Sequence, residues 1–525
     1  MSNNKNATKG LAGIIAASSV GTLIEWYDFY IFGSLATIIA TKFFPSGNQT
    51  LALLSTLATF AAGFVVRPFG ALFFGRLGDL IGRKYTFLVT LVLMGLSTFL
   101  IGCIPGYESI GYLAPVLVLI LRLLQGLALG GEYGGAATYV AEHSPAERRG
   151  FWTSWIQTTA TIGLFVSLLV IVTVKGAMNK DAFADWGWRI PFWVSIIMVA
   201  ISIVIRMRMK ESPLFAKVKA EGKISTNPLK ESFGHKLNFK FVLLALFGAT
   251  MGQGVVWYTG QFYALSFIQT TLSVDVSQAS KLIMWALLFA TPFFVFFGWL
   301  SDRIGRKWIM LIGMLVAIVS YRFIYSAMYD AGSVKMKKEV AAQTVTDVKM
   351  SADAHVAGDS IKTTNIAKVF EDGTTYKEEK KETIHADISK ADPAKDVKIT
   401  KTVMLDDGSF WKLVFLVFIQ VLFVTMVYGP IAAFLVEMFP TRIRYTSMSL
   451  PYHIGNGIFG GLLPAVATFL ATKATQANEA AAKAGAALPY EKPFLEGLWY
   501  PIIIAGVCFI IGALYINGED NRIED

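Results

Sequence analysis

Two acidic residues, Glu25 and Asp28, lie inside the first long apolar run of the chain, from about residue 11 to residue 40. A run of that length can cross a bilayer, which takes roughly 20 residues. Residues three apart share one face of a helix, so both carboxyl groups should point the same way near mid-membrane. Such groups are costly unless they face a bundle interior or a wet cavity, and burial favours their protonated form. The pair could therefore take up and release protons; the alternative is that both acids only stabilise a helix–helix contact.

Arg122 and Glu132 are ionisable residues of the fourth apolar segment. An arginine inside a membrane needs an anion. Counted from the segment ends, Arg122 lies at a depth similar to that of Glu25 and Asp28, so we expect it to face this pair across a cavity. There it would keep the acids ionised or accept a substrate carboxylate. Glu132 lies about ten residues on, roughly 15 Å along the helix axis, which places it outside the pair. It is either a proton-coupling residue or a polar residue at the cavity rim.

The elements that position these residues are long apolar helices. The chain is 54% hydrophobic and only 16% charged, whereas soluble domains carry about 25% charged residues. About twelve apolar segments predict an all-α integral membrane protein with twelve transmembrane helices. Basic residues concentrate in alternate short loops, which predicts that these loops and both termini are cytoplasmic. This clustering also argues against nucleic acid as the partner, despite a formal net charge of +10.

An internal repeat divides the chain. The ten residues Gly75 to Lys84 recur in similar form at Gly298 to Lys307, after the second and the eighth apolar segments. We expect two six-helix halves related by an axis along the membrane normal, which is a transporter architecture. The glycines permit tight turns, and each aspartate can pair with an arginine or cap a helix N-terminus. The candidate gating residues of the two loops are Gly75, Asp79, Arg83, Lys84, Gly298, Asp302, Arg306 and Lys307.

The chain therefore divides into five parts. They are an N-terminal six-helix half (1–209), a cytoplasmic linker (210–238), helices 7–9 of the C-terminal half (239–330), a polar extracytoplasmic insertion (331–409) and helices 10–12 (410–525). In the insertion, Asp372-Gly373 and Asp407-Gly408 each stand between apolar positions, which is a hairpin signal. The insertion is either a small β-rich cap or a mostly disordered loop.

The stretches from Glu25 to Tyr30 and from Arg122 to Gly135 resemble the metabolite:proton symporter branch of the major facilitator superfamily. This branch includes the α-ketoglutarate, citrate and shikimate permeases and the proline/betaine transporter. The residues from Lys210 to Phe215 and from Glu437 to Arg444 are similar to patterns shared with sugar porters. The resemblance implies the two-half fold of that superfamily, repeated loops that latch its conformations, and a cavity lined by spans one, four, seven and ten. The 331–409 insertion is a departure, because the outer loop at this position is usually short.

Polar and aromatic residues on the four cavity-lining spans are the candidate substrate-binding residues. They are Tyr27, Tyr30, Gln125, Gln253, Trp257, Tyr258, Gln261, Gln420 and Tyr428. Gln253, Trp257 and Gln261 follow one another at four-residue steps, so they should share one stripe of the seventh helix. Their amide and aromatic groups could bind a small polar solute, although aromatic residues are also common in packing and at membrane interfaces. His453 could relay protons or be a packed core histidine.

These features predict a transporter and not an enzyme. No phosphate-binding loop and no Cys or His spacing typical of a metal site occurs in the sequence, so we expect no cofactor and transport driven by a proton gradient. The predicted function is proton-coupled import of an organic acid or a zwitterionic osmolyte by alternating access, in the bacterial inner membrane, by a monomer whose partners are its substrate, protons and lipid. A sugar facilitator or drug exporter on the same scaffold, or a non-transporting sensor, is the alternative.

Overall fold

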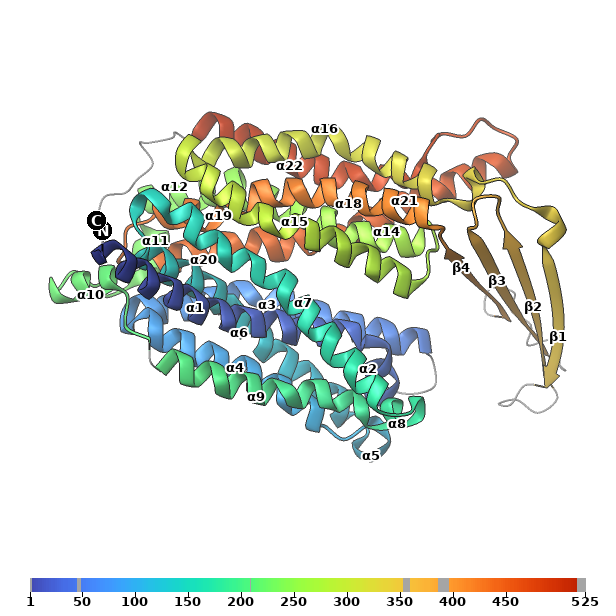
Figure 1. Cartoon of the computed structure of the whole chain (residues 1–525), viewed down its shortest axis with the longest axis horizontal. Coiled ribbons are helices and arrows are strands. Elements are labelled where there is room, and N and C mark those ends of the chain that lie inside the picture. The colour runs from blue at the N-terminus through green and yellow to red at the C-terminus, as the bar shows by residue number, and fades with distance from the viewer. Residues whose placement is uncertain (1, 45–48, 208, 353–358, 386–395, 517–525) are drawn as a thin grey trace.

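The computed structural model describes residues 2–44, 49–207, 209–352, 359–385 and 396–516. Long helices run side by side, and a β-sheet projects from the end of the molecule opposite the two termini (Figure 1). Helices that precede residue 210 form one bundle, coloured blue to green, and those that follow residue 235 form a second bundle beside it. We call these the N-terminal and the C-terminal bundle. Within the described residues, ten helical stretches are long and apolar enough to cross a membrane.

Among the described residues, the N-terminal bundle and the linker contain eleven α-helices. They are α1 (Ser2–Ser34), α2 (Ala36–Phe43), α3 (Gln49–Ile81), α4 (Arg83–Cys103), α5 (Tyr107–Ile110), α6 (Leu113–His143), α7 (Arg149–Ala177), α8 (Lys180–Asp185), α9 (Ile190–Met207), α10 (Pro213–Ala220) and α11 (Pro228–Gly234). The short α10 and α11 lie in the linker. Each begins with proline after a capping side chain, Ser212 or Asn227, that accepts a backbone N–H, as expected at helix N-termini.

The C-terminal bundle contains helices interrupted by π-helical turns. Its elements are α12 (Lys236–Ala245), η3 (Leu246–Thr250), α13 (Met251–Tyr258), η4 (Thr259–Tyr263), α14 (Ala264–Thr270), α15 (Val276–Ile304), α16 (Arg306–Gly332), α18 (Asp407–Tyr428), α19 (Ile431–Met438), α20 (Arg444–Ile454), η8 (Gly455–Gly460), α21 (Leu463–Lys483), η9 (Pro493–Leu498) and α22 (Trp499–Tyr515). The turns η3, η4 and η8 are π-helical. Such turns add a residue to a helical turn and often mark functional sites.

The repeated loops make the same sharp turn in both bundles. Gly82 separates α3 from α4 with a φ of 122°, and Gly305 separates α15 from α16 with a φ of 94°. An L-amino acid with a side chain rarely adopts these angles, so both positions require glycine. The repetition in sequence is therefore a repetition in backbone geometry.

A four-stranded antiparallel sheet lies between α16 and α18. Its strands β1 (Val345–Ala352), β2 (Ser360–Val369), β3 (Thr375–Ile384) and β4 (Val397–Met404) pair in sequence order. The β-rich alternative for this segment is thus the one observed. The hairpin prediction at Asp372-Gly373 is confirmed, because Gly373 has a φ of 91° in the turn between β2 and β3. The second hairpin prediction is wrong: the Asp406 side chain accepts the Ser409 N–H, so this turn is the N-cap of α18.

Backbone and side-chain hydrogen bonds hold the sheet to the C-terminal bundle. The Val403 N–H donates to the Ser273 carbonyl at 2.7 Å, and the Asp275 N–H donates to the Val403 carbonyl at 2.8 Å. The Gln278 amide donates to the Leu405 carbonyl at 2.9 Å and accepts the Leu405 N–H at 2.8 Å. Because β4 is tied to the bundle, β1 is the strand farthest from the helices (Figure 1).

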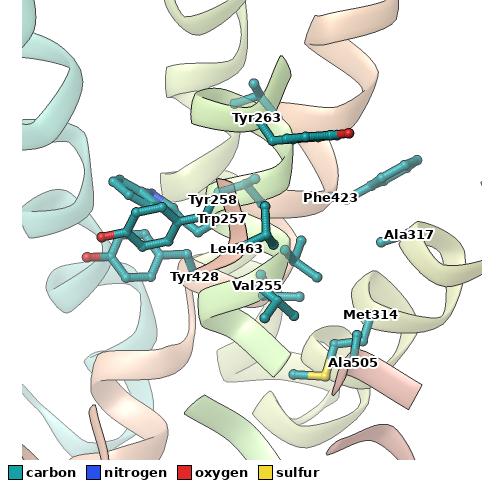
Figure 2. Close-up of a cluster of buried hydrophobic side chains, with 14 of the residues drawn as sticks. Val255, Trp257, Tyr258, Tyr263, Met314, Ala317, Phe423, Tyr428, Leu463 and Ala505 are labelled. Carbon is teal, nitrogen blue, oxygen red and sulfur yellow. The ribbon is translucent and has the colours of Figure 1, made fainter. Parts of the chain in front are cut away.

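A large apolar core fills the C-terminal bundle. Val255, Met314 and Leu463 are buried in it, and Trp257 and Tyr428 lie at one side of the same cluster (Figure 2). The aromatic side of this core meets the N-terminal bundle, since Trp257 contacts Trp26 of α1 with ring centroids 5.7 Å apart. The core therefore presents its aromatic rings to the junction between the bundles.

Candidate functional site

A cavity of about 50 Å³ lies where the two bundles meet. Helices α1, α3 and α6 of the N-terminal bundle and α13, α18, α20 and η8 of the C-terminal bundle line it. The lining residues are Thr22, Glu25, Trp26, Phe29, Arg67, Leu129, Tyr133, Trp257, Tyr258, Tyr428, Tyr452, His453 and Asn456. A small enclosed space with an acid, a base and many aromatic rings is suited to a small polar molecule.

Aromatic rings from both bundles form the walls of the cavity. Tyr133 of α6 stacks on Tyr452 of α20, with ring centroids 3.7 Å apart and planes 6° from parallel. The hydroxyl groups of Tyr452 and Tyr428 are 2.7 Å apart. Since the contact between Tyr133 and Tyr452 crosses the junction, any movement of one bundle against the other must change the shape of the site.

Arg67 is the cation of the cavity, and the sequence reasoning missed it. Its guanidinium lies 4.2 Å from the ring centroid of Phe64 and 5.6 Å from that of Phe29. The Arg67 Nε atom is buried without a hydrogen-bond partner among the described residues. The sequence did contain a signal for this residue: Arg67 precedes Pro68 inside the second apolar run. A charged side chain is costly there, which marks it as a candidate functional residue.

Glu25 lies beside Glu132, which corrects the expectation that Glu132 stands apart. Both carboxyl groups interact electrostatically with each other, and Glu25 also interacts with Arg206 and Arg67. Arg206 of α9, which is 1% exposed, forms an ion pair with Glu132 and donates to the Phe87 carbonyl at 2.6 Å. The expectation failed because depth was counted from Arg122 alone, whereas the buried cation that gathers these acids comes from α9.

Asp28 has separate surroundings. It accepts a hydrogen bond from Ser195 at 2.8 Å and interacts electrostatically with Arg122. Arg122 itself donates to Gln125 at 2.8 Å, and Gln125 donates to Thr98 at 2.6 Å. Arg122 therefore meets Asp28, as expected, but the cations next to Glu25 are Arg206 and Arg67. Glu25 and Asp28 therefore lie on one face of α1 but interact with different cations.

The nine candidate substrate residues separate into two groups. Trp257, Tyr258 and Tyr428 line the cavity, and Tyr30 stacks on Trp26 at 5.8 Å between ring centroids. Tyr30 is not itself a lining residue, and neither are Tyr27, Gln125, Gln253, Gln261 and Gln420.

Gln125 is held by Arg122 and Thr98, and the exclusion of Tyr27 and of the other three glutamines also has a local cause. The Tyr27 hydroxyl donates to the Pro191 carbonyl at 2.7 Å, inside the N-terminal bundle. The Gln420 amide contacts Met328 Sδ at 3.2 Å, inside the C-terminal bundle. Gln253 does not reach the cavity, because its amide exchanges hydrogen bonds with the lining residue Asn456 at 2.9 and 3.1 Å. Gln261 falls in the π-helical η4, so the four-residue stripe with Gln253 is not kept.

His453 lines the cavity, and its Nε2 atom is buried without a hydrogen-bond partner among the described residues. It therefore has the location that a proton relay requires. A packed histidine would also have this location, so both readings of His453 stay open.

The first repeated loop joins the two bundles at the end where the termini lie. Asp79 accepts the Thr446 N–H at 2.8 Å, at the start of α20, and pairs with Arg83 at 3.1 Å. Arg83 also donates to the Thr441 carbonyl at 2.7 Å and to Glu142 at 3.3 Å. Both predicted roles of the aspartate, pairing with arginine and capping a helix, therefore occur at the same residue.

The second repeated loop makes the equivalent contacts, from the C-terminal bundle to the N-terminal bundle. Asp302 accepts the N–H groups of Gly150 and Phe151 at 2.7 and 2.8 Å, at the start of α7. Arg306 pairs with Asp302 at 2.7 Å and donates two hydrogen bonds of 2.7 Å to Glu437. Together the two networks close the junction on the side of the termini.

Of the remaining loop residues, the two glycines support this closure, whereas the two lysines make contacts within their own bundles. A Cβ atom on Gly75 would come within 2.9 Å of the backbone of α20, and one on Gly298 would come within 2.6 Å of the Gly150 carbonyl. Lys84 and Lys307 each donate to a carbonyl at the end of a neighbouring helix, α9 or α22, at 3.0 Å. Glycine is thus needed at two close approaches between the bundles.

Comparisons with known proteins agree with this geometry. A family model described as "Sugar (and other) transporter" matches residues 14–227. The alpha-ketoglutarate permease of Escherichia coli (strain K12) is 37% identical over 321 residues, which cover 61% of this chain and 72% of the permease. The proline/betaine transporter of the same strain is 35% identical over 316 residues, which cover 58% of this chain and 62% of that transporter. The chain thus spans less than two thirds of the length of that transporter.

The fold is found in solved transporters. The structure of the proton:xylose symporter XylE of the major facilitator superfamily covers 98% of both chains, with a TM-score of 0.61 and 14% identity. At this identity the likeness shows the fold: the chain has the multi-helix fold of the major facilitator superfamily. The family is shown by the alpha-ketoglutarate permease, which is 37% identical and is covered over 72% of its length. Within this superfamily, the chain belongs to the family of metabolite transporters that includes the alpha-ketoglutarate permease and the proline/betaine transporter.

Proposed function

We propose that this chain imports a small polar metabolite, an organic acid or a zwitterionic osmolyte, together with protons. The observation that carries the proposal is the cavity, in which Glu25 and Arg67 are enclosed by aromatic rings from both bundles. A cavity at the junction of two bundles can face each side of the membrane in turn when the bundles rock.

The chemistry of the cavity favours a zwitterion over a neutral sugar. Arg67 offers a planar guanidinium to a carboxylate, which is the geometry that such groups bind best. Trp26, Trp257 and Tyr258 offer ring faces, which attract a cation such as a quaternary ammonium group. An anion that carries no positive charge would use Arg67 and leave the aromatic walls as apolar packing.

Arg67 also provides a way to couple the substrate to a proton. The Arg67 guanidinium interacts with Glu25 across the cavity. A substrate carboxylate that binds Arg67 competes for this cation, so Glu25 is then better accommodated with a proton. Glu132 lies beside Glu25 and could exchange that proton with it. Asp28, next to Arg122, is a second candidate for proton binding.

The transport cycle uses the contacts at the termini. With α1 and α3 counted beside the ten apolar stretches, the chain has twelve membrane spans in two six-helix halves. We place both termini on the cytoplasmic side of the bacterial inner membrane, and the β-sheet outside. The networks of Asp79 and Asp302 then hold the cytoplasmic side closed, and they must break before substrate and proton can leave inward. The chain acts as a monomer in this scheme.

Uptake into proteoliposomes tests the proposal. The wild-type protein should accumulate glycine betaine, proline or α-ketoglutarate only when a pH gradient is imposed. Glu25→Gln should lose this accumulation, by about 100-fold or more, yet still exchange labelled for unlabelled substrate across the membrane. Glu496→Gln, which changes a carboxyl on η9 outside the cavity, is the matched control and should transport normally.

Three outcomes contradict the proposal in different ways. Undiminished gradient-driven accumulation by Glu25→Gln rejects the coupling role of Glu25. Uptake of xylose without dependence on the pH gradient points to a sugar facilitator. No exchange of any substrate by the wild-type protein points to a sensor.

A further inference from the structure

A second, larger cavity lies on the outside of the C-terminal bundle and shares no lining residue with the site described above. It is a groove of about 410 Å³ between α12–η3 and the last turns of α22. The residues along it include Lys236, Phe239, Lys240, Leu243, Phe247 and Tyr515. Both walls lie at the end of the bundle where the chain termini are (Figure 1). The groove is therefore at the edge of the membrane-spanning region.

The groove changes character along its length. Lys236 and Lys240 are the first and fifth residues of α12, so they share one helix face. The same face continues inward with Leu243 and Phe247, which are apolar. Tyr515 stands opposite on α22, and a tyrosine is a residue that favours the water–membrane boundary. The groove is thus basic at the end formed by Lys236 and Lys240 and apolar along Leu243 and Phe247.

We propose that this groove binds one anionic phospholipid, with the phosphate on Lys236 and Lys240 and an acyl chain along Leu243 and Phe247. The order of polar and apolar groups along the groove matches the order along such a lipid. Basic pockets between membrane-spanning helices are known to select anionic headgroups by charge.

Charge complementarity favours an anionic lipid over a zwitterionic one. None of the lining residues of the groove is acidic, and both lysine side chains are exposed. Among the described residues, the acid nearest to Lys236 along the chain is Glu231, which pairs with Arg442 at 2.6 Å. Lys236 and Lys240 form no ion pair among the described residues, so their ammonium groups can bind an anion at the membrane surface, where basic residues attract anionic lipids.

Native mass spectrometry of the purified full-length chain tests the proposal without any transport measurement. The protein is incubated with phosphatidylglycerol or with phosphatidylcholine of the same acyl chains. The wild-type protein should retain one phosphatidylglycerol at concentrations at which phosphatidylcholine is lost. Lys236→Gln/Lys240→Gln should bind phosphatidylglycerol about tenfold more weakly, whereas Lys236→Arg/Lys240→Arg should bind it like the wild type.

The matched control is Lys217→Gln/Lys219→Gln, which removes two exposed lysines of α10 outside the groove and should leave binding unchanged. Equal retention of the two lipids by the wild type overturns the proposal, as does full retention by the Lys236/Lys240 glutamine variant. Inorganic phosphate serves as a competitor: if it displaces the lipid at equal concentration, the acyl chain contributes nothing and the groove is only a phosphate site. Because Glu25 is not involved, this result stands apart from the test of proton coupling.

Discussion

The two bundles contribute different chemistry to the same cavity. The N-terminal bundle holds its charged residues inside: Glu25, Asp28, Arg122, Glu132 and Arg206 are all buried. The C-terminal side of the cavity has no acid or arginine among its lining residues; it offers Trp257, Tyr258, Tyr428, Tyr452, His453 and Asn456. In the proposed cycle, the N-terminal bundle therefore binds the protons and the C-terminal bundle encloses the substrate.

This difference predicts unequal effects of mutation in the two walls. Arg67→Gln removes the cation that would bind a substrate carboxylate. A hydrogen bond to a charged group contributes about 1.5–3 kcal/mol, so substrate affinity should fall roughly 10- to 100-fold. Trp257→Leu removes only a ring face, worth about 0.5–2 kcal/mol to a bound cation, and should reduce affinity less.

Isothermal titration of the purified variants with glycine betaine measures both effects. Arg67→Lys separates charge from shape, because lysine keeps the charge and loses the planar fork. If Trp257→Leu weakens binding more than Arg67→Gln does, then the aromatic rings contribute more to substrate affinity than the Arg67 charge. The C-terminal bundle would then be the main substrate-binding wall of the cavity.

The repeated loops, by contrast, should respond alike. Asp79→Asn and Asp302→Asn each remove the charge that caps a helix of the opposite bundle and pairs with an arginine. Each variant should open the side of the termini, and a loss of about 1 kcal/mol would shift this equilibrium about fivefold. A cysteine reporter at Ser449, which is buried beside Gly134 at the junction, measures the opening by its rate of labelling.

The reporter is placed in a background in which Cys103 and Cys508 are changed to serine. Equal acceleration by the two aspartate variants is expected from their mirrored contacts. If only one variant accelerates labelling, the two loops have the same backbone geometry but contribute unequally to the stability of the closed state.

The smallest expected effect lies in the sheet, far from both walls. His385 is close to two carboxylates, with Nε2 3.0 Å from Asp396 and Nδ1 2.6 Å from Asp359. Hydrogen bonds to Asp396 and Asp359 raise the pKa of His385 above its ordinary value. The protonated ring can donate to both acids at once, so it joins the ends of β2, β3 and β4.

Because the folded-state pKa is raised, this contribution is fully present below the ordinary pKa of about 6.5. It is lost as the pH rises through the raised value. Hydrogen exchange at the amides of β3 should therefore show less protection on the alkaline side, once corrected for the intrinsic pH dependence of exchange. His385→Gln should remove that pH dependence while the sheet stays folded. An unchanged profile in this variant would assign the protection to the strands alone.

Much of the architecture could be predicted from local patterns. The apolar segments, the repeated loops with Gly82 and Gly305, and the turn at Asp372-Gly373 depend on residues close together in the chain. The turn at Asp407-Gly408 failed for a local reason too, since an Asp-Gly pair serves equally well at a hairpin and near a helix N-terminus, and the helix that follows decided between them.

The sequence by itself determined that Glu25, Asp28 and Arg122 are ionisable residues of apolar segments and that Glu25 and Asp28 share a helix face. Glu25 and Asp28 follow from length and periodicity alone. Only the tertiary structure decided that Glu25 meets Glu132, Arg206 and Arg67 while Asp28 meets Ser195 and Arg122. The physical reason is that helical periodicity determines the direction of a side chain on its own helix, whereas its partner depends on how neighbouring helices tilt, cross and take π-helical turns.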